Sequence, residues 1–254
     1  GMNTLNISTA SALLLASMGT KVAKHGNKAV SSKCGSGDVL EALKIKIDLE
    51  PNDIKKEINN NHFGFIFAPN YHGAMRFVGP VRKKIGKRTI FNMIGPLSNP
   101  ALVDRQVIGV FDKKLLKIFA EGLRNLHIKF AWIVNSEDGL DEISPYAKTN
   151  VIQLKNGIIS EIIIDPKSIN VNAEKFENLI GDDANFNADK IIEIFKGKDN
   201  DFSKAVCLNA AAGLIVTEKF IEFSDAYKSA REFILTGKPY SHLEKIQNVW
   251  EYIK

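Results

Sequence analysis

A regular alternation of strand and helix patterns in the middle of the chain constrains the fold most. Residues 106–111 (QVIGVF) and 130–134 (FAWIV) are short, apolar and rich in β-branched side chains, as buried strands are, and residues 113–126 between them have helical spacing. A helix that connects two strands in this way places them parallel in one sheet. This region therefore predicts an α/β fold.

An antiparallel hairpin is predicted directly after this region. Residues 151–154 and 158–164 are strand-like and flank the tripeptide Lys-Asn-Gly at 155–157, and an Asn-Gly pair favours the tight turn of a hairpin. Earlier in the chain, residues 63–68 (FGFIFA) form another apolar run typical of a buried strand. These segments predict a mixed, mostly parallel sheet flanked by helices, with a short antiparallel annex.

The C-terminal part of the chain is predicted to be helical. Residues 205–216 (AVCLNAAAGLIV) are apolar on nearly every side, which indicates a core helix in which Cys207 is a packing residue. No repeat, low-complexity tract or clear linker divides the sequence. We expect a single domain over residues 1–254.

Charge, cysteine content and hydropathy indicate which ligands and which cellular compartment suit the protein. The net charge of +5 suits an anionic ligand, but the acidic residues are spread through the chain, so it is weak evidence for nucleic acid. The two cysteines give no disulfide framework, which favours a reducing compartment. No apolar run approaches the roughly 20 residues that span a bilayer. We expect a cytoplasmic protein that does not enter membranes.

Two donor-rich turns near the N-terminus predict an anion site. Residues 22–35 carry lysine, histidine, asparagine and serine side chains without periodicity, and Ser36 then begins a helical pattern; Asn6-Ile7-Ser8-Thr9 precedes a second helical run. Unpaired N–H groups and the helix dipole favour phosphate at such places. Two of them suggest one polyphosphate bound between them, although an ordinary polar surface loop has the same composition.

Two further groups have side chains suited to ligand binding. Arg82 lies close to the apolar face of a predicted helical segment that Gly79-Pro80 interrupts, so it either binds an anion or carbonyl or extends to water. Asp141 and Glu142 follow the second predicted strand, and ligands gather at the carboxyl ends of strands in α/β sheets. This acid pair either holds Mg²⁺ or is simply solvated.

Several short motifs, ordered along nearly the whole chain, resemble those of the anthranilate phosphoribosyltransferases. Any single one is a weak signal, but the ordered set is specific. The motifs are Asn6-Ile7-Ser8-Thr9, Lys24-His25-Gly26-Asn27, SSKCGSGD at 31–38, APNYH at 68–72, RTIFN at 88–92, GPLSNP at 95–100, Gly139-Leu140-Asp141-Glu142 and LNAAA at 208–212.

This resemblance implies a nucleoside phosphorylase/phosphoribosyltransferase-type fold and a Mg²⁺-dependent reaction. The phosphoribosyl group of phosphoribosyl pyrophosphate (PRPP) is transferred to the amine of anthranilate, a step of tryptophan biosynthesis, with no catalytic acid, base or nucleophile assigned. By the resemblance, PRPP binds Thr4, Asn6, Ser8, Thr9, Lys24, His25, Gly26, Asn27, Ser31, Ser32 and Ser36; anthranilate binds Asn27, His72, Arg82 and Gly95; and the metal binds Ser8, Asp141 and Glu142.

The sequence also departs from this family. Family members have a small helical domain and a G-T-G-G-D loop before the N-I-S-T motif, whereas this sequence starts at Gly1-Met2-Asn3. The helical domain usually forms the homodimer contact, so we expect this chain alone to turn over poorly, to bind PRPP weakly and to lack that contact. Two alternatives stay open: a thymidine-type nucleoside phosphorylase, and a non-catalytic paralogue that binds nucleic acid.

Overall fold

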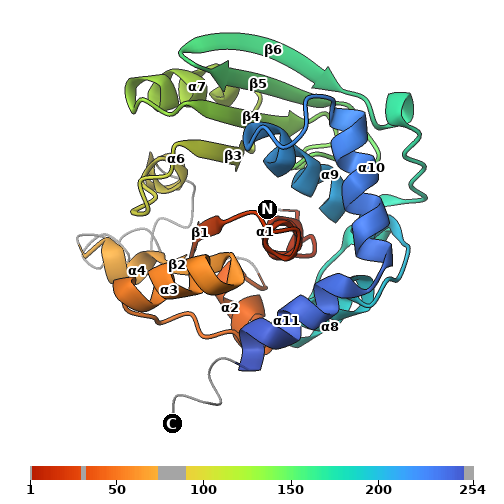
Figure 1. Cartoon of the computed structure of the whole chain (residues 1–254). Helices are drawn as coiled ribbons and strands as arrows, with labels where there is room; N and C mark the ends of the chain where they lie inside the picture. Colours follow the sequence, from red (N-terminus) through yellow and green to blue (C-terminus); the bar gives the residue numbers. More distant parts are fainter. Residues whose placement is uncertain (1, 30–32, 74–89, 249–254) are drawn as a thin grey trace.

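The N-terminal part of the molecule is built around a small parallel sheet. The computed structural model of the chain describes residues 2–29, 33–73 and 90–248. Strand β1 pairs with β2 in register from Val22 opposite Phe63 to Gly26 opposite Phe67. The elements of this part are α1 (Ile7–Ser17), β1 (Val22–Gly26), α2 (Ser36–Ala42), α3 (Pro51–Asn61), β2 (Phe63–Phe67), α4 (Ala68–Tyr71) and α6 (Ile90–Leu97) (Figure 1).

A four-stranded sheet with the order β3-β4-β5-β6 forms the second part. Strands β3 (Arg105–Gly109) and β4 (Phe130–Ser136) are parallel and connected by α7 (Leu115–Asn125), as the alternating pattern predicted. Strands β5 (Thr149–Lys155) and β6 (Ile158–Ile164) form the predicted hairpin. Asn156 and Gly157 both have positive φ, which the tight turn between the strands requires.

The expected mixed α/β class is confirmed, with a different division of the strands. The described strands belong to two sheets rather than one, and β5 pairs antiparallel with β4 along seven residues. The hairpin therefore makes up half of the larger sheet instead of a short annex. The interruption expected at Gly79-Pro80 lies outside the described residues.

Every residue of β4 is buried, and helix α7 and the later helix α9 (Asp201–Val216) both pack against this strand. Phe130, Trp132 and Val134 pack in the main core, whereas Ala131 and Ile133 pack in a second cluster with residues of α7. The remaining elements are two 3₁₀ turns (Pro166–Ile169 and Phe176–Leu179) and the helices α8 (Ala184–Phe195), α9 (Asp201–Val216), α10 (Phe223–Leu235) and α11 (Lys238–Asn248).

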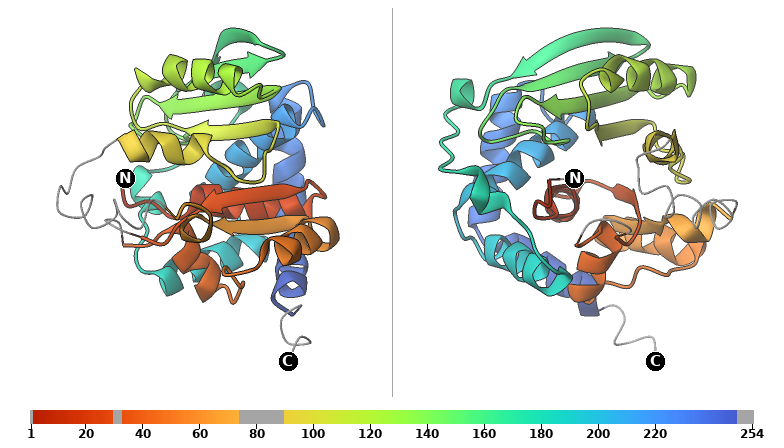
Figure 2. Two further views of the ribbon diagram at one scale, coloured as in Figure 1. Left: turned by 90° about the vertical axis from the view of Figure 1, so that its left-hand side faces the viewer. Right: turned by 180° about the vertical axis from the view of Figure 1, so that it is seen from behind.

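Helix α9 is the core helix that its composition predicted, since all its residues except Lys204 are buried. It packs against α1, which lies near the middle of the molecule beside β1 (Figures 1 and 2). No helix among the described residues is both long and apolar enough to cross a lipid bilayer.

Candidate active site

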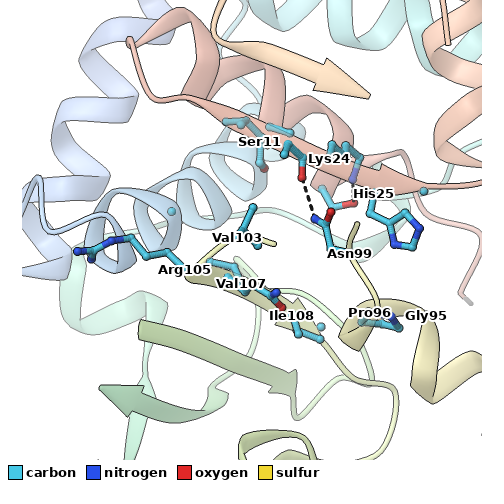
Figure 3. A pocket seen from close by; sticks show the side chains of 18 of the residues that line it. Ser11, Lys24, His25, Gly95, Pro96, Asn99, Val103, Arg105, Val107 and Ile108 are labelled. Atoms are coloured by element: carbon cyan, nitrogen blue, oxygen red, sulfur yellow. Dashed lines mark hydrogen bonds between the residues drawn. The ribbon is translucent and has the colours of Figure 1, made fainter. Parts of the chain in front are cut away.

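A cavity of about 880 Å³ lies between the two sheets. All residues of β1 and all residues of β3 line it, together with residues of α1 and α9 and the acid pair Asp141 and Glu142. Figure 3 shows Lys24 and His25 of β1 on one side of this cavity and Val107 and Ile108 of β3 on the other. The cavity therefore collects side chains from segments that are far apart in the sequence.

Three of the predicted site residues form one hydrogen-bonded chain at the cavity wall. The Lys24 ammonium donates to Ser8 Oγ at 3.2 Å, and the Ser8 backbone N–H donates to Glu142 Oε1 at 3.0 Å. The two donor-rich turns are therefore neighbours, as the sequence suggested, and the acid pair lies beside them.

Burial shifts the pKa values of Lys24 and Glu142, the two ionisable residues joined by these hydrogen bonds. It lowers the pKa of Lys24 to about 8, against the opposing effect of the Glu142 charge. Burial also raises the pKa of Glu142 to about 8, and the neighbouring Asp141 charge adds to this shift, while the Ser8 N–H and Lys24 oppose it. A nearby cation would therefore stabilise the ionised form of Glu142.

The loop between β1 and α2 is folded onto the start of α2. Asp38 Oδ2 accepts hydrogen bonds from Ala29 N at 2.7 Å and from Gly35 N at 2.8 Å. Asn27 O accepts from Gly37 N at 3.0 Å and from Ser36 Oγ at 3.2 Å. The Ser36 hydroxyl is thus engaged by the loop itself and does not line the cavity.

A histidine pair lies at one end of the cavity. The Nε2 atoms of His25 and His72 are 3.2 Å apart and their rings meet edge to face, so one ring donates a hydrogen bond and the other accepts it. Burial lowers the pKa of His25, and the His72 and Lys24 charges add to the effect, while a hydrogen bond to the Gly95 backbone opposes it. The lowered pKa favours the neutral form of the His25 ring.

The structure brings most of the predicted site residues to this cavity, but not all. Those that line it are Ser8, Lys24, His25, Gly26, Asn27, His72, Gly95, Asp141 and Glu142. Those outside its lining are Thr4, Asn6, Thr9 and Ser36, and Ser31, Ser32 and Arg82 lie outside the described residues.

The residues outside the lining have other surroundings. Thr4 forms an antiparallel bridge with Ile180, and Asn6 Oδ1 accepts a hydrogen bond from Asn187 Nδ2 at 2.9 Å. The Thr9 side chain is buried, and its hydroxyl has no hydrogen-bond partner among the described residues. Of these contacts, only the one at Asn6 is a side-chain hydrogen bond.

Two asparagines at the cavity had no role in the sequence-based prediction. Asn99 Nδ2 donates to the Ala23 carbonyl of β1 at 3.1 Å (Figure 3), and Asn209 of α9 hydrogen-bonds to the backbone of Ile143, next to the acid pair. Asn99 belongs to the motif GPLSNP and Asn209 to the motif LNAAA. Membership of these motifs was the only feature of the sequence that could have identified the two residues.

Comparison with known proteins agrees with the resemblance of the motifs over nearly the whole chain. Residues 1–240 match the family model described as "Glycosyl transferase family, a/b domain". The chain is 79% identical over 249 residues to the anthranilate phosphoribosyltransferase of Pelagibacter ubique, covering 98% of this chain and 76% of that protein.

The chain belongs to the anthranilate phosphoribosyltransferase family. It is therefore an enzyme of the glycosyltransferase type, and the thymidine-type phosphorylase alternative is not favoured. The chain spans about three quarters of the length of the relative from P. ubique.

Solved structures of anthranilate phosphoribosyltransferases have the same fold. The enzyme of Thermus thermophilus superposes with a TM-score of 0.91 at 35% identity, over 99% of this chain and 75% of that chain. The Saccharomyces cerevisiae enzyme in complex with PRPP and Mg gives 0.89 at 26% identity, over 99% and 71%. Its complex with 4-fluoroanthranilate gives 0.87 at 25% identity, over 100% and 71%.

Proposed function

We propose that this chain transfers the phosphoribosyl group of PRPP to the amine of anthranilate, giving N-(5-phosphoribosyl)anthranilate and pyrophosphate in tryptophan biosynthesis. The observation that carries the proposal is the hydrogen-bonded chain of Lys24, Ser8 and Glu142 at the cavity wall. It combines an ammonium and a hydroxyl, which suit phosphate oxygens, with a carboxylate, which suits a cation. The yeast relative with the same fold was solved with PRPP and Mg.

PRPP is assigned to the side of the cavity formed by the two donor-rich turns. Ser8, Lys24, His25, Gly26 and Asn27 line the cavity there and would contact its phosphates and ribose. Ser31 and Ser32, which lie outside the described residues, would offer two further hydroxyls to PRPP in this proposal. Thr4, Asn6, Thr9 and Ser36 would hold the two turns in shape from behind the cavity wall.

The residues beside Lys24 fit Mg²⁺. Ser8, Asp141 and Glu142 offer only oxygen donors, which Mg²⁺ prefers. Among the described residues, no three His, Cys, Asp or Glu side chains cluster as a complete metal cage. This suits Mg²⁺, which is commonly held by one or two carboxylates together with substrate phosphates and water. When bound, it would stabilise negative charge on the leaving pyrophosphate.

Anthranilate is assigned to the side of the cavity near the histidine pair. Asn27, His72 and Gly95 line the cavity there, and Arg82 would bind the carboxylate of anthranilate through its guanidinium group. The yeast relative solved with 4-fluoroanthranilate supports this class of ligand.

The reaction in this proposal needs no nucleophile from the protein. The anthranilate nitrogen forms a bond to the anomeric carbon of the ribose, the bond from that carbon to pyrophosphate breaks, and the nitrogen then loses a proton to water. Positive charge develops on the ribose and negative charge on the leaving group. Fixed donors such as Lys24 and Ser8 stabilise the leaving group, and the cavity holds the two substrates in line.

The test is calorimetric titration of the chain with PRPP, with and without Mg²⁺. We expect Mg²⁺ to strengthen PRPP binding, and we expect Lys24→Met to weaken it about tenfold or more in both conditions, because a charge-assisted hydrogen bond is lost. Lys21→Met is the matched control: Lys21 lines the same cavity but donates to Asn59 Oδ1 at 2.7 Å. Absence of any Mg²⁺ effect in the wild type, or equal losses in the two lysine variants, would contradict the proposal.

A further inference from the structure

The side-chain amide of Asn209 is joined to the backbone beside the acid pair. Its Oδ1 accepts a hydrogen bond from Ile143 N at 2.9 Å, and its Nδ2 donates to Ile143 O at 2.9 Å and to Ala205 O at 2.9 Å. The backbone N–H and C=O of Ile143 are therefore both hydrogen-bonded to the side chain of Asn209. Asn209 and Ile143 are buried, so a backbone group that loses its partner here is costly to leave unpaired.

Asn209 connects the acid pair to the buried helix α9. Ile143 directly follows Glu142, so the position of its backbone decides where the Glu142 side chain starts. The neighbours of Asn209 in α9, Leu208 and Ala210, are completely buried, and closely packed interiors allow little movement. A fixed helix thus holds one end of the acid pair.

Two further contacts show that the direction of Glu142 is set from several sides. The Ser136 hydroxyl of β4 donates to the Glu142 carbonyl at 2.8 Å, and the Ser8 N–H donates to Glu142 Oε1 at 3.0 Å. The bond from Ser8 orients only the carboxylate, whereas the bonds from Ser136 and Asn209 hold the backbone that carries it.

We infer that Asn209 is a positioning residue for the acid pair and that it sets how strongly Mg²⁺ promotes PRPP binding. This inference rests on the proposed function. Residues that orient metal ligands commonly change metal affinity by about 10- to 100-fold when they are replaced. Asparagine is required here because the site needs one acceptor and two donors in one short side chain.

Two variants of Asn209 separate positioning from simple loss of stability. Asn209→Ala removes all three hydrogen bonds. Asn209→Asp keeps the shape and the acceptor but faces the Ile143 and Ala205 carbonyls with an oxygen in place of the donor. The added negative charge by itself would strengthen cation binding, so weaker promotion by Mg²⁺ in this variant points to misplacement of the acid pair.

The experiment measures the PRPP dissociation constant by calorimetry with and without Mg²⁺, together with the melting temperature of each variant. We expect both Asn209 variants to bind PRPP without Mg²⁺ within about twofold of the wild type, and the gain from Mg²⁺ to fall about tenfold. Asn61→Ala is the matched control, since Asn61 is a buried asparagine of α3 outside the cavity lining whose Nδ2 donates to Glu57 at 2.7 Å. The Asn61→Ala variant should keep the full gain in PRPP affinity from Mg²⁺.

The outcomes are distinguishable. If the wild type responds to Mg²⁺ and the folded Asn209 variants respond equally, Asn209 is only structural and this inference fails alone. If Asn209→Ala does not fold, the Asn209→Asp variant decides. If the wild type shows no gain from Mg²⁺, the proposed function and this inference fail together.

Discussion

Two loops reach the cavity and are held in different ways. The loop between β1 and α2 is held locally: Asp38 accepts hydrogen bonds from Ala29, nine positions away, and from Gly35. The loop between β4 and β5 also has local hydrogen bonds, such as the one from Ser136 to the Glu142 carbonyl, but segments far away in the sequence hold its acid pair as well. Ser8 is 134 positions from Glu142, and Asn209 is 66 positions from Ile143. Around Asp38 the first loop is thus shaped mainly by residues near it in the sequence, whereas the position of the acid pair also depends on the packing of distant segments.

Replacing Gly109 of β3 should disturb the distantly held loop most. A Cβ at this position would overlap the carbonyl oxygen of Asp141, so the loop or the strand must move. We expect Gly109→Ala to lower the free energy of unfolding by about 2–3 kcal/mol and to remove most of the Mg²⁺-dependent gain in PRPP affinity, measured by denaturant unfolding and calorimetry.

Gly122→Ala provides the control for this glycine. Gly122 lies inside α7, where the nearest atom to an added Cβ is Leu97 Cδ1 at 3.5 Å, an ordinary contact. Since alanine is favoured over glycine in a helix interior, we expect this variant to be unchanged or up to about 1 kcal/mol more stable. A Gly109→Ala variant as stable and as responsive to Mg²⁺ as Gly122→Ala would show that the acid loop is not held by its approach to β3.

The next largest effect is expected at Asp201, the first residue of α9. Burial opposes ionisation of this carboxyl, but hydrogen bonds from Asn178, the Glu174 N–H and Lys204 outweigh it and lower its pKa. A carboxyl with a lowered pKa stabilises the fold above its unfolded-state pKa and loses that contribution as the pH falls through the lowered value. Asp201→Asn should cost about 2 kcal/mol at pH 7.

The pH profile gives this prediction its test. The difference in unfolding free energy between the wild type and Asp201→Asn should shrink as the pH falls below about 4, where the unfolded chain takes up its proton. A difference that stays constant from pH 7 to pH 3 would mean that the ionised carboxylate does not anchor the start of α9.

The smallest effect is expected in the locally held loop. Asp38→Ala removes two hydrogen bonds to a partly exposed carboxylate and should cost about 1–2 kcal/mol. Because it alters the phosphate side of the cavity and leaves the acid pair in place, PRPP affinity should fall by the same factor with and without Mg²⁺ in calorimetry. Asp53→Ala, at an exposed ion pair with Lys56 of α3, should change stability by no more than about 0.5 kcal/mol. A selective loss of the Mg²⁺ effect in Asp38→Ala would show that the two loops act as one unit.

The sequence predicted the elements of this fold better than their assembly. The alternation between residues 106 and 134, the Asn-Gly turn and the apolar helix α9 are local patterns, and the structure has all three. The division of the strands between two sheets was not predictable, because the apolar runs of β2 and β3 do not say which strand will lie beside them.

In the candidate site, too, local motifs identified some residues and missed those that act through distant contacts. The N-I-S-T and K-H-G-N motifs pointed to Ser8 and Lys24, which are hydrogen-bonded to each other in the structure. Asn209 and Gly109 could not be assigned in this way, since each acts on a residue far away in the sequence. A buried asparagine and a strand glycine have no local pattern that names their partners.

By itself, the sequence determined which segments become helices and strands, and which carry phosphate-binding and acidic side chains, because periodicity and turn chemistry act over a few residues. The tertiary structure decided that Lys24, Ser8 and Glu142 meet at one cavity wall, that the Thr9 hydroxyl is buried away from it, and that Asn209 fixes the backbone beside the acid pair. These contacts join distant segments, and only the close packing of the core around α1 and α9 brings those segments together.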